Sequence, residues 1–345
     1  MDVVEPAMVI DADEAQARIS LRHRLEFLAF RIVLAGARVL PIDRVSALGA
    51  SVMRRVGPRL RQNRRALTNL AVAFPEKTET ERRAITVEMW ANMGRTFAET
   101  LVLDRLAREP QRFDIPNRDA MAADVATASA VVGCSLHMGN WEAAILPMVL
   151  FGRQPAGVYK PLDNPLINQW LIGARTTMFP GGLLGKGDRD EGRAGQRTAR
   201  LLIDRARSGN AVGFIADHFD RRGEPIAFMG RTARFTIAPA MIARHVGARI
   251  WLGRCLRVGP GSRFRIDMHE LAVQRTTDKK ADGLATTTAM FAAFEAWIRA
   301  NPEQWMWWNT RWIEAATPDA EMAAETGVAA AAIREVQGSS PPTTP

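Results

Sequence analysis

The sequence contains little cysteine and almost no lysine. Only two cysteines, Cys134 and Cys255, occur among 345 residues, which excludes a disulfide framework and a multi-cysteine zinc site and fits a reducing compartment. Five lysines and 41 arginines make up the 46 basic residues, and the formal net charge is +9. Because guanidinium groups bind phosphates bidentately, we expect phosphorylated or anionic partners. A GC-rich genome is the other explanation of this bias.

Several catalytic and targeting motifs are also missing. No GxSxG sequence is present, which disfavours the serine nucleophile of an α/β-hydrolase. The glycine-rich stretch around Lys186 lacks the spacing and the Ser or Thr of a phosphate-binding P-loop. Asp217, His218 and Asp220 lie close together, but no second cluster completes a coordination shell, so we expect no metal. The acidic N-terminus lacks the pattern of a signal peptide.

An apolar segment at about residues 25–42 raises the question of a membrane. It is short for a membrane span and contains Arg31 and Arg38. An amphipathic helix in the membrane interface would let these arginines reach the lipid headgroups, and we expect this arrangement rather than a buried first helix or a true span. Six arginines between residues 54 and 65 form a positive patch. This patch is either a solvated helix face or a site for anionic lipid.

The order of elements predicts an α/β domain. Helical periodicity covers residues 43–73 and 78–107, with Thr78 and Glu81 at capping-box spacing. From residue 129, short apolar runs rich in β-branched residues alternate with helical stretches. This pattern indicates a mixed, mostly parallel sheet flanked by helices. The expected strands are 129–136, 156–160, 211–217, 249–256 and 263–269.

The ends of the chain differ in composition from its middle. We expect a flexible leader at residues 1–20, one domain at 21–315 and a flexible tail at 316–345. The aromatic stretch at 301–312 is either part of the core or an interfacial belt, and we expect core packing.

One histidine follows the first expected strand, where ligands collect in open α/β sheets. His137 precedes Glu142 by five residues, a spacing that chance produces easily. On one helix these positions point about 140° apart, so pairing requires a strand-to-helix turn. Gly139 permits such a turn and Asn140 is a suitable helix N-cap. A carboxylate on one imidazole nitrogen makes the other more basic, as removal of a proton from an alcohol requires.

The stretch HMGNWE, residues 137–142, resembles the HX4(D/E) motif of the late acyltransferases of bacterial lipid A biosynthesis. This lauroyl/myristoyl transferase family belongs to the lysophospholipid acyltransferase superfamily. Four further blocks resemble the family in order, and the resemblance covers about residues 25–315. They are NLAVAFPEKTETER (69–82), GVYKPLDNPLIN (157–168), GFIADHFD (213–220) and NPEQWMWWNTRW (301–312).

The resemblance implies a glycerol-phosphate-acyltransferase-like fold with an N-terminal membrane-associating helical segment, on the cytoplasmic face of the cell inner membrane. It implies an O-acyltransferase that needs no cofactor. The donor would be acyl-acyl carrier protein or acyl-CoA, and the acceptor a hydroxyl of a lipid A precursor in lipopolysaccharide biosynthesis. The GNWE form also occurs in relatives that acylate mannosylated phosphoinositides, so another glycolipid or a lysophospholipid stays open as the acceptor.

Carried over by position, His137 would be the general base and Glu142 its orienting partner. Lys160, where the family usually has Arg, would bind substrate together with Asn164 and Asp217. Backbone N–H groups near Asn140 would stabilise the oxyanion during direct transfer without a covalent acyl-enzyme. The alternatives are a basic nucleic-acid-binding protein, which lacks a recognisable motif here, and a catalytically dead membrane-binding relative.

Overall fold

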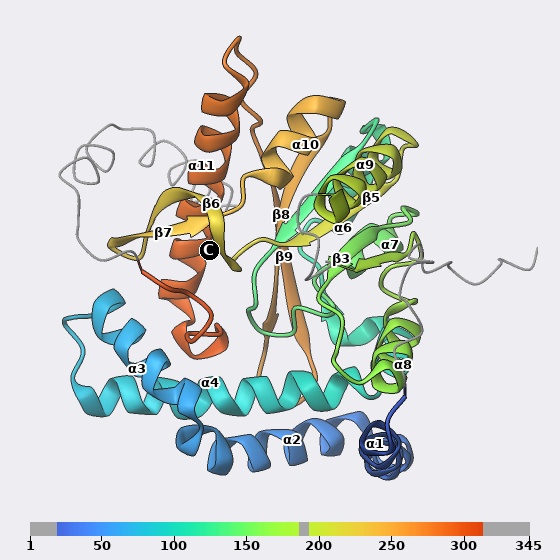
Figure 1. The fold of residues 1–345 in the computed structure, drawn as a ribbon, viewed down its shortest axis with the longest axis vertical. Coiled ribbons are helices and arrows are strands. Elements are labelled where there is room, and N and C mark those ends of the chain that lie inside the picture. Colours follow the sequence, from blue (N-terminus) through green and yellow to red (C-terminus); the bar gives the residue numbers. More distant parts are fainter. Residues whose placement is uncertain (1–18, 186–192, 313–345) are drawn as a thin grey trace, which may run out of the picture.

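A seven-stranded sheet with helices on both faces forms the centre of the protein in the computed structural model (Figure 1). The structure describes residues 19–185 and 193–312. The expected leader, except its last two residues, and the expected tail therefore lie outside the described residues.

The sheet is mixed and mostly parallel, as predicted. Its order is β1-β9-β8-β2-β5-β3-β4, in which β8, β2, β5, β3 and β4 are mutually parallel and β9 is antiparallel to β8. All five expected strands are present. The strands are β1 (Phe113–Asp114), β2 (Val131–Ser135), β3 (Ala156–Tyr159), β4 (Leu183–Gly185), β5 (Ala211–Ile215), β8 (Arg249–Arg257) and β9 (Phe264–Leu271). Strands β6 (Phe219–Phe228) and β7 (Arg231–Phe235) form a separate hairpin.

The helices precede the sheet in sequence and then alternate with its strands. They are α1 (Leu21–Val39), α2 (Ile42–Val56), α3 (Arg61–Ala73), α4 (Glu79–Thr100), α5 (Leu103–Ala107), α6 (Arg118–Thr127), α7 (Leu146–Leu150), α8 (Pro165–Arg175), α9 (Arg193–Arg207), α10 (Ala238–Val246) and α11 (Lys279–Ala300). The Thr78–Glu81 capping box at the start of α4 is confirmed. The helical segment predicted at 43–73 is divided at Gly57, where a Cβ atom would lie 2.2 Å from Trp90 Cγ.

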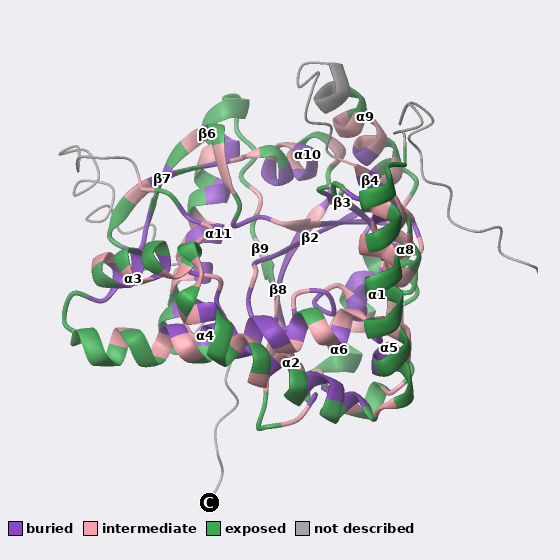
Figure 2. Ribbon diagram, turned by 60° about the horizontal axis from the view of Figure 1, so that its bottom comes forward, coloured by how far each residue is buried: buried purple, intermediate pink, exposed green. Residues whose placement is uncertain are grey.

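Helix α1 lies at the side of the molecule and is mostly exposed (Figure 2). Ala37 is its one buried residue, so α1 is not a buried first helix. It contacts α8, where Phe30 packs edge-on against Trp170, and its Arg38 forms an ion pair with Asp104 of α5. Among the described residues, no helix is both long and apolar enough to cross a membrane.

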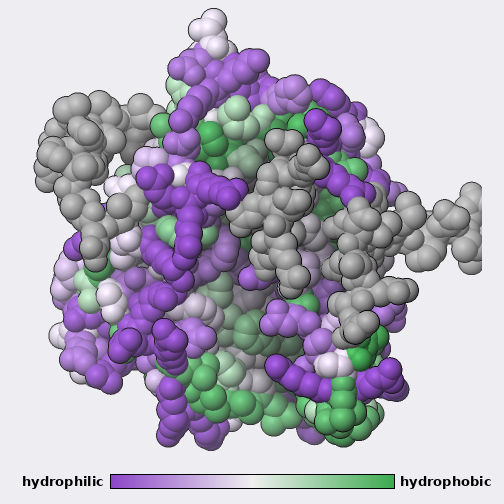
Figure 3. Space-filling view, viewed as in Figure 1, coloured by the Kyte–Doolittle hydropathy of each residue, from purple (hydrophilic) through white to green (hydrophobic). Residues whose placement is uncertain are grey.

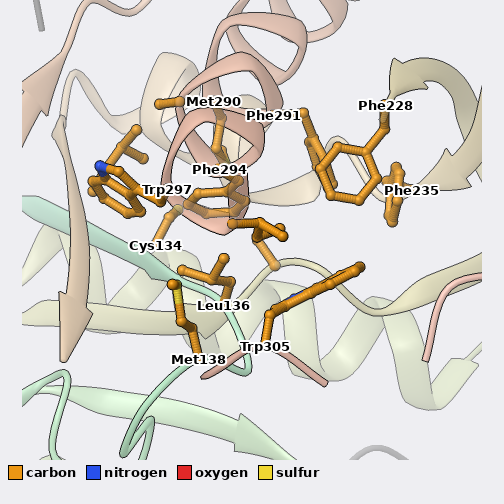
Figure 4. Close-up of a cluster of buried hydrophobic side chains, with 14 of the residues drawn as sticks. Cys134, Leu136, Met138, Phe228, Phe235, Met290, Phe291, Phe294, Trp297 and Trp305 are labelled. Atoms are coloured by element: carbon orange, nitrogen blue, oxygen red, sulfur yellow. The ribbon is translucent and has the colours of Figure 1, made fainter. Parts of the chain in front are cut away.

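Large aromatic side chains fill the face of the sheet that α10 and α11 cover (Figure 4). Phe228 and Phe235 from the hairpin pack against Phe291 of α11. Trp305 and Trp307 are fully buried in the same cluster, which confirms the expected core packing of the 301–312 stretch. Burial of such side chains is a large source of folding free energy.

Candidate active site

His137 follows β2 at the edge of the sheet where the parallel strands end. Its backbone N–H donates to Asp217 Oδ2 at 2.9 Å, and its Nδ1 lies 2.7 Å from Asp217 Oδ1. Because a carboxylate only accepts, this contact places the proton of the neutral imidazole on Nδ1. Nε2 then carries the free lone pair. The imidazole is 22% exposed, which leaves it open to a substrate.

Asp217 follows β5, the neighbour of β2, and is fully buried. It also accepts a hydrogen bond from Trp305 Nε1 at 2.8 Å. Burial opposes ionisation of this carboxyl group, but the electrostatic attraction of His137 and the hydrogen bonds from His137 and Trp305 outweigh it and hold the pKa of Asp217 below its usual value. Asp217 is therefore a fixed anion behind the imidazole.

Glu142, the predicted partner of His137, binds a different residue. Its Oε2 accepts from Arg175 Nε of α8 at 2.7 Å, and its other oxygen binds the same guanidinium. Burial lowers the pKa of Arg175, but the charge and hydrogen bonds of Glu142 raise it above its usual value. The turn after His137 therefore directs Glu142 to α8, and Asp217 takes the place beside the imidazole.

The turn itself depends on Gly139. This residue has a φ of +57°, and a Cβ atom there would lie 1.9 Å from the Cys255 carbonyl oxygen. Its N–H donates to the Gln304 carbonyl at 2.9 Å, and its carbonyl accepts from Asn92 and Thr96 of α4. Only glycine tolerates both the conformation and the close approach. The predicted role of Gly139 in a tight turn is confirmed.

Asn140 is not a helix N-cap, contrary to prediction. Its Oδ1 accepts from the Glu142 N–H at 3.2 Å, and its Nδ2 donates to Glu99 of α4 at 2.8 Å. The next helix, α7, begins only at Leu146. The backbone N–H groups of Gly139, Asn140 and Glu142 all donate within the protein. These three groups are therefore already used and do not serve as the expected oxyanion donors.

A buried ion pair supports this loop, and sequence reasoning missed it. Glu99 is fully buried and accepts two hydrogen bonds from Arg257 of β8, at 2.6 and 2.8 Å, and one from Ser262 at 2.7 Å. Glu99 and Arg257 are 158 residues apart in the chain. No local pattern connects them, although two strongly polar residues inside apolar elements were a signal for a buried pair.

The other predicted substrate-binding residues lie apart from this pair. Lys160 is exposed directly after β3, at the same end of the sheet as His137. Asn164 caps α8 and donates to the His23 carbonyl and to Glu26 of α1, both at 2.9 Å. Its described contacts attach α1 to α8. The described residues contain no group of three or more His, Cys, Asp or Glu that could hold a metal.

An apolar pocket lies beside His137, on the face of the sheet opposite the aromatic cluster. It has about 490 Å³ of empty space, part of which is open to solvent. The Trp141 ring lines it and lies 5.4 Å from the His137 ring. The other walls include Ile145, Met148, Phe179 and Trp251. An imidazole nitrogen with a free lone pair beside an apolar pocket fits a substrate with a reactive polar end and a long apolar chain.

The sequence of the chain matches a known protein family. The model of the family described as bacterial lipid A biosynthesis acyltransferase matches residues 14–314. The chain belongs to this family. Enzymes of this family transfer acyl groups, so the chain is an acyltransferase. The α/β fold agrees with this assignment.

Two kinds of relatives are similar to this family member at the same low identity. The lipid A biosynthesis lauroyltransferase of Escherichia coli K12 is 26% identical over 254 residues, which cover 70% of this chain and 76% of that enzyme. The phosphatidylinositol mannoside acyltransferases of two Mycobacterium tuberculosis strains are 26% identical over 211 residues. These cover 61% of this chain and 62% of the mycobacterial enzymes, less than two thirds of their length.

Proposed function

We propose that the protein transfers a fatty acyl chain from a thioester to a hydroxyl of a lipid A precursor, as a secondary acylation in lipopolysaccharide biosynthesis. The observation that carries this proposal is the His137–Asp217 pair beside an apolar pocket. Nε2 of His137 takes the proton of the acceptor hydroxyl while its oxygen bonds to the thioester carbonyl carbon. The C–S bond then breaks, and the thiolate leaves with the proton from the imidazolium.

Asp217 supports this step through the imidazole. It holds the ring with Nε2 free, and its negative charge stabilises the imidazolium formed in the transition state. Burial strengthens this interaction, because the buried carboxylate is shielded from water. In this mechanism Glu142 acts as an anchor: its ion pair with Arg175 attaches the loop after His137 to α8. No covalent acyl-enzyme is required.

We propose that the acceptor arrives from the surface of the cell inner membrane, at its cytoplasmic face. Exposed apolar side chains gather over α1 and α2, as the lower part of Figure 3 shows; the larger ones are Leu21, Leu25, Leu28, Ile32, Val33, Val39, Leu48, Val52 and Val56. Patches of this kind mark contact with lipid or protein. The neighbouring arginines of α2 and α3 suit anionic headgroups.

A chain of aromatic rings leads to the histidine from α4, the helix that packs against α2. Phe97 of α4 is 52% exposed, and its ring lies 6.2 Å from that of Trp141. Trp141 in turn contacts His137. A lipid held at the membrane surface has an apolar route along these rings to Nε2.

We propose acyl carrier protein as the donor. The β6–β7 hairpin begins two residues after Asp217 and presents four exposed arginines, Arg221, Arg222, Arg231 and Arg234. A basic surface next to the catalytic pair suits an acidic carrier protein and the phosphate of its prosthetic group. Acyl-CoA carries the same thioester and phosphate chemistry but lacks the acidic protein surface.

A glycolipid other than a lipid A precursor is the second candidate acceptor. It is favoured by the similarity to the mycobacterial mannoside acyltransferases, which matches the similarity to the lauroyltransferase in identity. Both acceptors fit the same base, pocket and membrane surface, so the test must identify the acylated lipid.

The test uses purified protein on anionic lipid vesicles that contain a lipid A precursor, with acyl-acyl carrier protein as donor. Wild-type protein should co-sediment with the vesicles and add one acyl chain, as mass spectrometry of the lipid would show. Removing the base in His137→Ala should lower turnover by about 10²- to 10⁴-fold without loss of vesicle binding.

A His137→Ala variant with near-wild-type turnover would contradict the assignment of the base. Acylation of a mannosylated phosphoinositide but not of the lipid A precursor would replace the first acceptor with the second.

A further inference from the structure

At the deep end of the apolar pocket, adjacent strands place glycines at the same level. Gly133 of β2 pairs with Gly213 of β5, which pairs with Gly157 of β3. On its other side, Gly133 pairs with Trp251 of β8. The three glycines therefore form a row across the sheet, with the Trp251 side chain as a wall at one end.

Phe179 closes the other end of this glycine row. A Cβ atom would lie 2.6 Å from its ring at Gly157 and 3.3 Å from it at Gly213. The ring thus occupies the space that side chains on these strands would fill. Ile145 lies over the middle of the row, where its Cδ1 atom approaches both Gly133 and Gly213.

The pocket ends at the level of the glycine row. On β2 its lining begins at Gly133, and on β5 at Gly213. Val131 and Ala211, one level deeper, are fully buried and do not line it. Strands advance about 3.3 Å per residue, so the floor lies roughly 13 Å from the level of His137.

We propose that the glycine row, Trp251 and Phe179 set the length of the acyl chain that the enzyme transfers. This inference rests on the proposed function. A thioester carbonyl at His137 would direct its alkyl chain past Trp141 toward the floor, where the terminal methyl group meets the glycine row. A longer chain would have to displace one of the two rings. A shorter chain leaves space unfilled, and one methylene in such a pocket changes kcat/KM by about 10- to 200-fold.

Gly133→Ala and Gly213→Ala raise the floor by one methyl group. Their Cβ atoms would lie 3.3 and 3.1 Å from Ile145 Cδ1, the far end of a flexible side chain, so the fold can adjust. Gly173→Ala on α8 is the matched control, because no heavy atom lies within 4 Å of the new Cβ. The measurement is kcat/KM across a series of acyl thioesters of graded chain length.

Both floor variants should shift the preferred chain to a shorter one. The ratio of kcat/KM for the longest good substrate to that for the next shorter one should fall about 10- to 200-fold. Gly173→Ala should keep the wild-type profile. This ratio is independent of the folded fraction, because both substrates meet the same enzyme sample.

Trp251→Leu should shift the preference to longer chains. Trp251 Nε1 has no hydrogen-bond partner among the described residues, so the replacement breaks no hydrogen bond. A second measurement needs no turnover: the rise in thermal unfolding midpoint with free fatty acids of graded length should follow the same shifts.

Unchanged length profiles in Gly133→Ala and Trp251→Leu, in both measurements, would overturn the proposal. A protein that discriminates fatty acids by length but transfers no acyl group would instead contradict the proposed function and leave the length-setting role of the floor supported.

Discussion

The two faces of the sheet are built from the same strands, but one face is covered by large side chains and the other borders the apolar pocket. On β2, Val132, Cys134 and Leu136 pack into the aromatic cluster beneath α10 and α11. Gly133 and Ser135 line the pocket on the opposite face. Because strand side chains alternate, one segment can supply a dense core and a hollow site together. We infer that the filled face carries stability and that the hollow face and the strand ends carry chemistry.

The largest loss of activity should come from changes at the strand ends. Asp217 and Glu142 are both buried there, but they bind different residues. Asp217→Asn removes the charge behind the imidazole and should lower kcat by about 10²- to 10⁴-fold. It should also move the pH dependence of kcat, which a purely structural defect would not. Asp217→Glu, which restores the charge, should recover part of the activity.

Glu142→Gln is the variant to compare with Asp217→Asn, because it removes the charge of the other carboxylate. It leaves the partly buried Arg175 without its ionic partner and should lower the free energy of unfolding by about 1–3 kcal/mol. The activity per folded molecule should fall much less than in Asp217→Asn. Equal losses of activity in the two variants, at equal folded fractions, would mean that both carboxylates act on the imidazole.

Phe291→Ala should destabilise the aromatic cluster on the filled face of the sheet. Phe291 is fully buried and stacks on Phe235 with ring centroids 3.9 Å apart. Its removal should lower the free energy of unfolding by about 3–5 kcal/mol, measured by urea denaturation. The acyl-length profile of the remaining folded enzyme should stay that of the wild type. A changed profile would show that the two faces are coupled through the sheet.

The smallest effect should come from the β6–β7 hairpin, outside both faces. Arg221→Glu should reduce kcat/KM with acyl-acyl carrier protein by several-fold at low salt and much less at high salt, because screening removes the interaction. Activity with acyl-CoA should change less. Arg118→Glu on α6 is a control at a distant exposed arginine. Equal losses with both donors would place the carrier protein elsewhere.

Much of the fold could be predicted from local patterns. Apolar β-rich runs predicted all five strands within two residues of their ends, and the Thr78–Glu81 pair predicted the start of α4. His137 could be singled out because it follows a buried strand. The family resemblance also pointed to Asp217, but as a substrate-binding residue. Its pairing with His137 could not be predicted, since Asp217 is 80 residues away and meets it only because β5 pairs with β2.

The same limit explains the wrong expectation for Asn140. The sequence allowed a helix to begin there, but the carboxylate of Glu99 and the carbonyl of Cys255 bind its side-chain and backbone N–H groups. These partners come from α4 and β8, and no short-range spacing reports them. The pocket was equally hidden, because the glycines of three separate strands share a level that appears only when the strand register is known.

The His137–Asp217 pair is assembled from distant parts of the chain: Asp217 binds His137 on one side and Trp305 on the other, and Trp305 comes from the last described segment. During synthesis the ribosome releases His137 long before Trp305, so the nascent chain cannot complete this constellation until nearly all of the domain has emerged. Activity that depends on this pair should therefore appear only late in synthesis. Turnover that depends on this pair would report whether the segments from β2 to Trp305 have come together.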